Sequence, residues 1–197
     1  APSLVSVLGN TINENGLGII TATISDPGTK DVFSVDVNWQ DGTSDTITGL
    51  GLVDASGTVG GTTYTWIAST RSLTLTHQYL DDGSYPGNGT ASDLYTVALT
   101  VTDDDLGTSN TTANVTVDNV APSLVSVLGN TINENGLGVI TATISDPGTQ
   151  DVFSVDVNWQ DGTSDTITGL GLVDASGTVG GTTYTWIAST RSLTLTH

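Results

Sequence analysis

Carboxylates are the main side chains that could do chemistry in this chain of 197 residues. The chain has 21 acidic residues against 3 basic ones, and all the acids except Glu14 and Glu134 are aspartates. It has no cysteine and only two histidines, which excludes thiol nucleophiles and zinc-thiolate sites. Clustered carboxylates repel one another unless a cation lies among them, and Ca²⁺ accepts about six to eight oxygen ligands in flexible geometry. We therefore expect calcium as a cofactor. The alternative is that Asp serves only as a turn residue and that the acid surplus maintains solubility.

An internal repeat organises the chain. Residues 1–77 recur at 121–197 with two changes, Ile19 to Val139 and Lys30 to Gln150, which gives a period of 120 residues. This period exceeds that of solenoid repeats and fits an independently folding domain. We expect residues 1–120 to form a complete repeat and residues 121–197 to form the first two thirds of a second one, within a longer array. The second repeat would then need its last two strands from elsewhere, by strand exchange or self-assembly between chains.

Alternation of apolar and polar residues predicts β-strands along the whole repeat. Residues 20–24, 33–39, 95–101 and 113–117 place an apolar side chain at every second position. Dipeptides such as Asp-Gly and Asn-Gly supply turns between these runs, and helical spacing is almost absent. The sequence therefore predicts an all-β sandwich of seven or more strands in each repeat.

Three segments carry a resemblance to a known family. The segment Val37–Gly42, which contains Trp39, is followed by His77-Gln78-Tyr79 and then by the alternating strand Tyr95–Asp103. Together they resemble the polycystic-kidney-disease (PKD) domain family, although Gln40 stands where that family usually has glycine. The resemblance implies an immunoglobulin-like β-sandwich, found in tandem in extracellular proteins and sometimes binding calcium. The nearest match resembles the repeats of giant bacterial surface proteins.

An immunoglobulin-like strand order would place alternate loops at opposite ends of the domain. The loops that hold residues 26–31 and 103–105 would then lie at the end where the chain enters. The other acidic loops of the repeat would lie at the opposite end, and in a head-to-tail array the second repeat would bring its own acids toward them. The candidate calcium ligands are Glu14, Asp26, Asp31, Asp41, Asp81, Asp82, Asp103, Asp104, Asp105, Asp118, Asp146 and Asp151.

Enzymatic sites are not indicated by this sequence. His77 falls in phase with the apolar residues Leu73 and Leu75, so we expect a structural histidine, with Tyr79 anchoring a corner through its hydroxyl group. Paired carboxylates such as Asp81 and Asp82 could serve glycoside hydrolysis, but aromatic residues make up only 6% of the chain. We expect Trp39, Trp66 and Tyr64 to be buried in the core, and we expect no enzyme activity.

The leading functional interpretation is a structural or adhesive spacer in an extracellular or cell-surface stalk, adhesin or filament, stiffened by calcium at the domain ends. Its partners would be adjacent repeats of the same protein. Two alternatives remain, a module that binds a surface glycan or receptor through residues 84–94, and an accessory domain of a secreted hydrolase. Three basic residues cannot neutralise a phosphate backbone, and no apolar run of about 20 residues is present, so we expect neither nucleic-acid binding nor membrane insertion.

Overall fold

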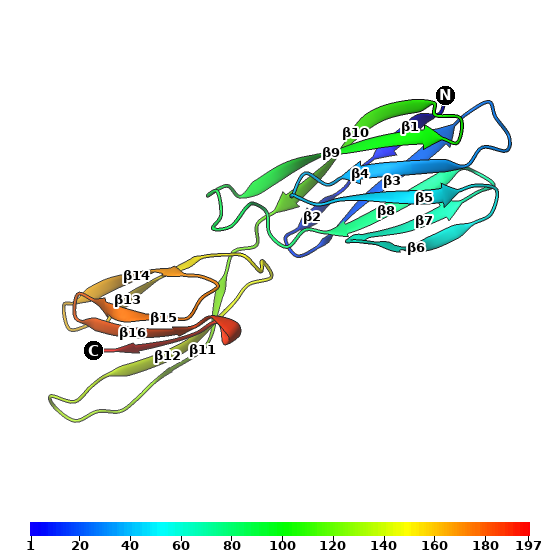
Figure 1. Ribbon diagram of the computed structural model, residues 1–197. Helices are drawn as coiled ribbons and strands as arrows, with labels where there is room; N and C mark the ends of the chain where they lie inside the picture. The colour runs from blue at the N-terminus through cyan, green and yellow to red at the C-terminus, as the bar shows by residue number, and fades with distance from the viewer. The chain divides into compact units, whose positions relative to one another are not determined.

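The computed structural model describes residues 1–197, which divide into two compact units (Figure 1). One unit comprises Ala1–Asp82 and Thr90–Asn119, and the other comprises Gly83–Gly89 and Val120–His197. Almost all regular structure is β-strand, which confirms the all-β prediction. The immunoglobulin-like relationship stays a prediction.

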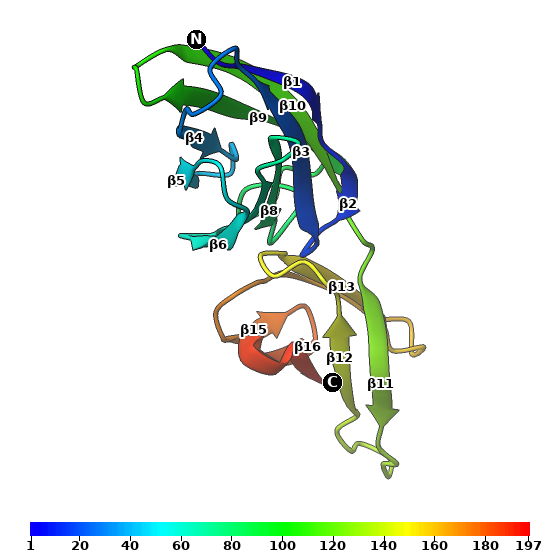
Figure 2. The same cartoon turned by 90° about the vertical axis from the view of Figure 1, so that its right-hand side faces the viewer.

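The first unit is a sandwich of two five-stranded sheets, whose layers are seen in Figure 2. The first sheet has the order β1-β3-β8-β7-β6, and the second has the order β2-β10-β9-β4-β5. The strands are β1 (Ser3–Leu8), β2 (Thr11–Asn13), β3 (Leu17–Ser25), β4 (Phe33–Asn38), β5 (Ser44–Leu50), β6 (Ala55–Val59), β7 (Thr62–Ile67), β8 (Ser72–Gln78), β9 (Ser92–Asp103) and β10 (Thr108–Asp118).

The core of this unit follows the alternation in the sequence. Every second residue of β4 is buried, and the same pattern holds along β3 and along the later parts of β9 and β10. Trp39 and Trp66 are 0% and 1% exposed, which confirms their expected burial between the sheets. Tyr64 is only partly buried where it packs against this core, because it lies beside the outer strand β6. The aromatic rings of Phe33 and Tyr79 complete the centre of this core.

The strand β2 was not expected from the sequence, because three residues are too few to show alternation. After β1 the chain leaves the first sheet and pairs in parallel with the end of β10, with Thr11 opposite Thr116. The crossing is close, since a Cβ atom on Gly9 would lie 2.0 Å from the backbone oxygen of Asn114. Glycine is therefore required at the point where the chain changes sheets.

The second unit repeats the first sheet and part of the second. Its larger sheet has the order β11-β12-β17-β16-β15, and β13 and β14 form a two-stranded sheet. The elements are β11 (Ser123–Gly129), β12 (Val139–Ser145), β13 (Phe153–Asn158), β14 (Ser164–Leu170), β15 (Ala175–Val179), β16 (Thr182–Ile187), the 3₁₀ helix η1 (Ala188–Thr190) and β17 (Ser192–Thr196). The helical structure is limited to the short η1, and none of it could span a membrane. Strand exchange with another chain stays a prediction.

Candidate cation-binding sites

Three aspartates from two loops come together at one end of the first unit. Asp26 and Asp31 lie in the loop between β3 and β4, and Asp103 ends β9. One carboxylate oxygen from each lies within 4.8 Å of the other two, so we call this group the 26–31–103 cluster. In the loop that follows β9, the Gly107 N–H donates a 2.6 Å hydrogen bond to Asp103 Oδ1. The two loops expected to share an end of the domain therefore do so.

Asp26 directs a buried carboxylate oxygen into this cluster. Its side chain is only 4% exposed, and its Oδ1 accepts a 2.7 Å hydrogen bond from the Gly28 N–H. Its Oδ2 accepts no hydrogen bond and lies 3.9 Å from the amino nitrogen of Ala1. A buried carboxylate oxygen without a donor is unfavourable, and a cation at this position would supply the missing partner.

The electrostatics of the cluster reflect the crowding of negative charge. The hydrogen bond from Gly28 lowers the pKa of Asp26. The pKa of Asp31 is raised, first by the side chain of the neighbouring Asp26 and then by burial and by repulsion from the charges of Asp26, Asp104 and Asp103. A bound cation would stabilise the charged form of Asp31 and so lower its pKa.

Arg71 holds the loop that carries Asp26 and Asp31. Its Nη1 donates a 2.8 Å hydrogen bond to the Asp26 carbonyl oxygen, and its Nη2 donates to the Gly28 carbonyl oxygen. The guanidinium carbon lies 5.3 Å above the ring centroid of Phe33. Sequence reasoning missed this clamp. The signal that could have found it is the scarcity of basic residues, since Arg71 is one of only three in the chain.

A second acidic group lies among loops at the other end of β3. Glu14, Asp81 and Asp82 are 2%, 4% and 6% exposed, and one carboxylate oxygen from each lies within 4.8 Å of the other two. We call them the 14–81–82 cluster. The Glu14 N–H donates a 2.9 Å hydrogen bond to the Asp118 carbonyl oxygen, and the Tyr95 hydroxyl group donates a 3.3 Å bond to the Asp82 carbonyl oxygen. Three carboxylates buried side by side form a second oxygen-rich candidate for a hard cation.

The remaining candidates of the first unit lie outside these two groups. Asp41 accepts hydrogen bonds from Thr43 and faces His77, with 2.7 Å between Oδ2 and Nε2. Asp104 and Asp105 are both exposed, and Asp104 accepts only a long bond of 3.4 Å from the Val32 N–H. Asp118 takes part only through its backbone, whose carbonyl oxygen accepts the hydrogen bond from the Glu14 N–H. Of the three consecutive acids at 103–105, the structure therefore brings only the first into a cluster.

Asp146 and Asp151 repeat the first loop in the second unit. Asp146 Oδ1 accepts a 2.8 Å bond from the Gly148 N–H, as Asp26 does from Gly28. Burial and the neighbouring Asp146 raise the pKa of Asp151 to about 6. Arg191 donates to the carbonyl oxygens of Asp146 and Gly148, so the clamp is present in both units. The approach of Asp146 and Asp151 to acids of the preceding repeat stays a prediction.

His77 is buried, as its phase in the strand predicted. It is 6% exposed, and its ring stacks on Trp39 with 4.9 Å between centroids and 18° between planes. Burial opposes the ionised form of Asp41, but hydrogen bonds from His77 and Thr43 outweigh it and lower the pKa of Asp41 to about 2. The carboxylate and the ring therefore brace the turn that follows β4.

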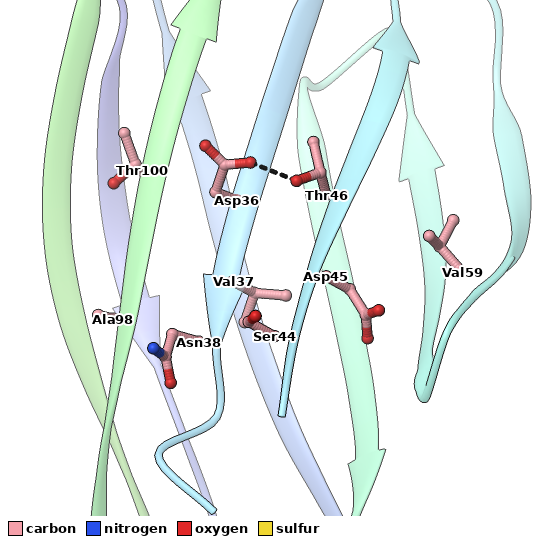
Figure 3. A pocket seen from close by; sticks show the side chains of 9 residues that line it. All are labelled: Asp36, Val37, Asn38, Ser44, Asp45, Thr46, Val59, Ala98 and Thr100. Carbon is pink, nitrogen blue, oxygen red and sulfur yellow. Dashed lines mark hydrogen bonds between the residues drawn. The ribbon is translucent and has the colours of Figure 1, made fainter. Parts of the chain in front are cut away.

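A shallow hollow of about 480 Å³ lies on the outer face of β4, β5 and β9 (Figure 3). Asp36 and Thr46 close part of it through a 2.6 Å hydrogen bond. Asn38, Ser44 and Thr100 add further polar groups to its lining. The hollow offers hydrogen-bonding groups on an open surface.

No protein-family model matches the chain, and no curated protein matches it either. The resemblance to PKD domains stays a prediction carried by the residues of the three segments.

Proposed function

We propose that the chain is a structural spacer repeat of an extracellular stalk, adhesin or filament, and that calcium binds the acidic loops at the ends of its units. The observation that carries this proposal is the donor-free Asp26 Oδ2, buried beside Asp31 and Asp103. The near-identity of residues 1–77 and 121–197 supports the spacer role, because a spacer requires reach rather than differentiated sites. Adjacent repeats are its partners in this proposal.

Calcium is the cation that the donor set fits best. The candidate ligands of the two clusters are all carboxylate oxygens, and all except Asp103, which ends β9, come from loops. Calcium tolerates irregular shells of oxygen ligands at roughly 2.3–2.6 Å, whereas magnesium requires near-octahedral order and zinc prefers nitrogen and sulfur. Binding would relieve the repulsion among the acids and link loops that are distant in sequence, which stabilises the folded unit.

Calorimetric titration of the whole chain with calcium, using matched variants, tests this proposal. Asp103→Asn and Asp105→Asn remove the same charge from the same turn, but only Asp103 lies in the 26–31–103 cluster. We expect Asp103→Asn to remove one binding event and Asp105→Asn to leave it in place. Glu14→Gln tests the 14–81–82 cluster in the same way. Absence of binding heat in the unmodified chain, together with an unchanged melting temperature, would reject calcium.

A second candidate function, a glycan- or receptor-binding module, is supported by the hollow on β4, β5 and β9. Saccharides are recognised by converging hydrogen-bonding groups, and Asn38, Ser44 and Thr100 are of that kind. A glycan array probed with the chain and with Asn38→Ala tests it. Binding that the substitution abolishes supports the second candidate, and an array without binding rejects it for the glycans tested.

A further inference from the structure

The four outer strands of the first unit differ in their protection against pairing with another chain. Natural sheets protect an edge strand by making it short, by a bulge, or by charge or proline. Strand β2 is three residues long. Strand β1 carries a bulge between Val5 and Leu8, and Ser6 within it has a φ of 52°. Strand β5 carries a bulge after Ile47 and also the charged Asp45. Three edges are therefore protected.

Strand β6 has none of these features. Its five residues, Ala-Ser-Gly-Thr-Val, include no charge and no proline, and they pair with β7 in continuous register. It is the outermost strand of its sheet, as Figure 1 shows. The outward side of its backbone is therefore an unprotected row of hydrogen-bonding groups.

Side chains hold β6 in an extended form that is ready to pair. The Tyr64 ring of β7 lies over Gly57, where an added Cβ atom would be 3.2 Å from the ring. On the outer face, the hydroxyl groups of Thr58 and Thr63 are 3.1 Å apart. An aromatic ring across a glycine is a known way to stabilise a glycine in an edge strand.

We propose that β6 pairs antiparallel with β6 of a second copy of this chain, about a two-fold axis at Gly57. This register places Ser56 opposite Thr58 of the second copy on the outer face, and Ala55 opposite Val59 on the inner face. Both pairs are compatible, because hydroxyl pairs and small apolar pairs stabilise antiparallel strands. The second unit carries the same strand as β15, which is also an outer strand paired in continuous register.

Strand β6 is a place where a second copy meets little charge repulsion. The chain has a formal net charge of −18, so most approaches between two copies oppose like charges. Strand β6 is a neutral segment, and self-pairing brings no acid of the strand opposite another. Asp54 precedes the strand. Just beyond the other end of the strand, the Gly61 N–H donates a 3.2 Å hydrogen bond to the Asp45 carboxylate. These flanking acids repel across the two ends of the pair, so added salt should strengthen the association.

A charge-swap experiment tests both the partner and the register. One variant carries Ser56→Lys and Thr58→Lys, with the same changes at Ser176 and Thr178. The other carries Asp at these four positions. In the proposed register, two copies of the same variant place like charges opposite each other across the strand pair. In a mixture of the two variants, Lys on one copy faces Asp on the other. Sedimentation velocity over a concentration series should show self-association of the unmodified chain, a loss on the order of tenfold in each variant alone, and recovery in the mixture.

A control variant separates the edge from the face. It carries Thr63→Lys and Thr65→Lys, with Thr183→Lys and Thr185→Lys. These substitutions add the same charge to the same outer face and also remove the contact between Thr58 and Thr63. They lie on β7 and β16, however, which are not edge strands. This variant should associate like the unmodified chain, and circular dichroism checks that all variants remain folded. A monomeric unmodified chain at every concentration would overturn the proposal, and so would equal association of the edge variants. Because calcium binding is measured separately, its failure would leave this result unaffected.

Discussion

The hydroxyl group of Tyr79 donates a 2.9 Å hydrogen bond to the backbone carbonyl oxygen of Trp39. Both residues are buried, and the bond joins the chain after β8 to the chain after β4, which belong to different sheets. Burial raises the pKa of Tyr79, so the hydroxyl group keeps its proton and remains a donor. The corner role expected for Tyr79 is thus confirmed as a link between the two layers.

Tyr79→Phe should destabilise the first unit by about 1–2 kcal/mol, because it leaves a buried carbonyl oxygen without a donor. Urea unfolding followed by tryptophan fluorescence measures the effect. Tyr64→Phe is the matched control, since Tyr64 is only partly buried, and it should change the free energy of unfolding by less than about 0.5 kcal/mol. Equal effects of the two substitutions would contradict a specific role for the bond.

The stability contributed by Asp41 should depend on pH in one direction. Its pKa is about 2 in the fold against an ordinary value of 3.8, so the folded state favours the ionised carboxylate. The contribution is complete above about pH 4 and is lost as the pH falls toward 2. The difference in unfolding free energy between the unmodified chain and Asp41→Asn, measured from pH 5 to pH 2, should shrink over that window. A difference that grows as the pH falls would reverse the assignment.

Equivalent glycines in the two units should respond differently to alanine. A Cβ atom on Gly18 would lie 2.6 Å from the Tyr79 ring and 3.2 Å from Val115, so Gly18→Ala should destabilise the first unit by about 1–3 kcal/mol. At Gly138 the nearest atom would be 3.6 Å away, in the Trp159 ring, which is an ordinary contact. Gly138→Ala should therefore be nearly neutral. Thermal melting of the two variants compares them, and equal losses would argue against the packing explanation.

Arg71 should support calcium binding although its charge opposes a cation. If the clamp on the Asp26 loop positions the ligands, Arg71→Lys should weaken calcium binding on the order of tenfold, because the two-pronged contact is lost while the charge is kept. Lys30→Gln is the matched control in the same loop, and it reproduces the natural difference at Gln150. Calorimetry would contradict the clamp if Arg71→Lys bound calcium as tightly as the unmodified chain.

Sequence periodicity predicted most of the fold, because the four long alternating runs are central strands with one face in the core. It missed β2, whose position depends on the close passage of Gly9 past Asn114 rather than on any pattern. For the candidate sites, loop order grouped Asp26, Asp31 and Asp103 correctly. It could not separate Asp103 from Asp105, because the direction of a side chain in a tight turn depends on local backbone geometry. Arg71 was missed because it binds backbone carbonyl oxygens, which every residue has, so the types of the residues that it contacts do not reveal the contact.

The most direct test of the account is the melting temperature of the whole chain in excess calcium and in excess chelator, with magnesium as the control cation. Calcium would bind the folded loops and not the unfolded chain, so it should raise the melting temperature by several degrees, and magnesium at the same concentration should raise it less. Asp103→Asn should reduce the calcium effect, and Asp105→Asn should not. An identical melting temperature in calcium and in chelator would contradict the central claim that a cation completes these acidic loops.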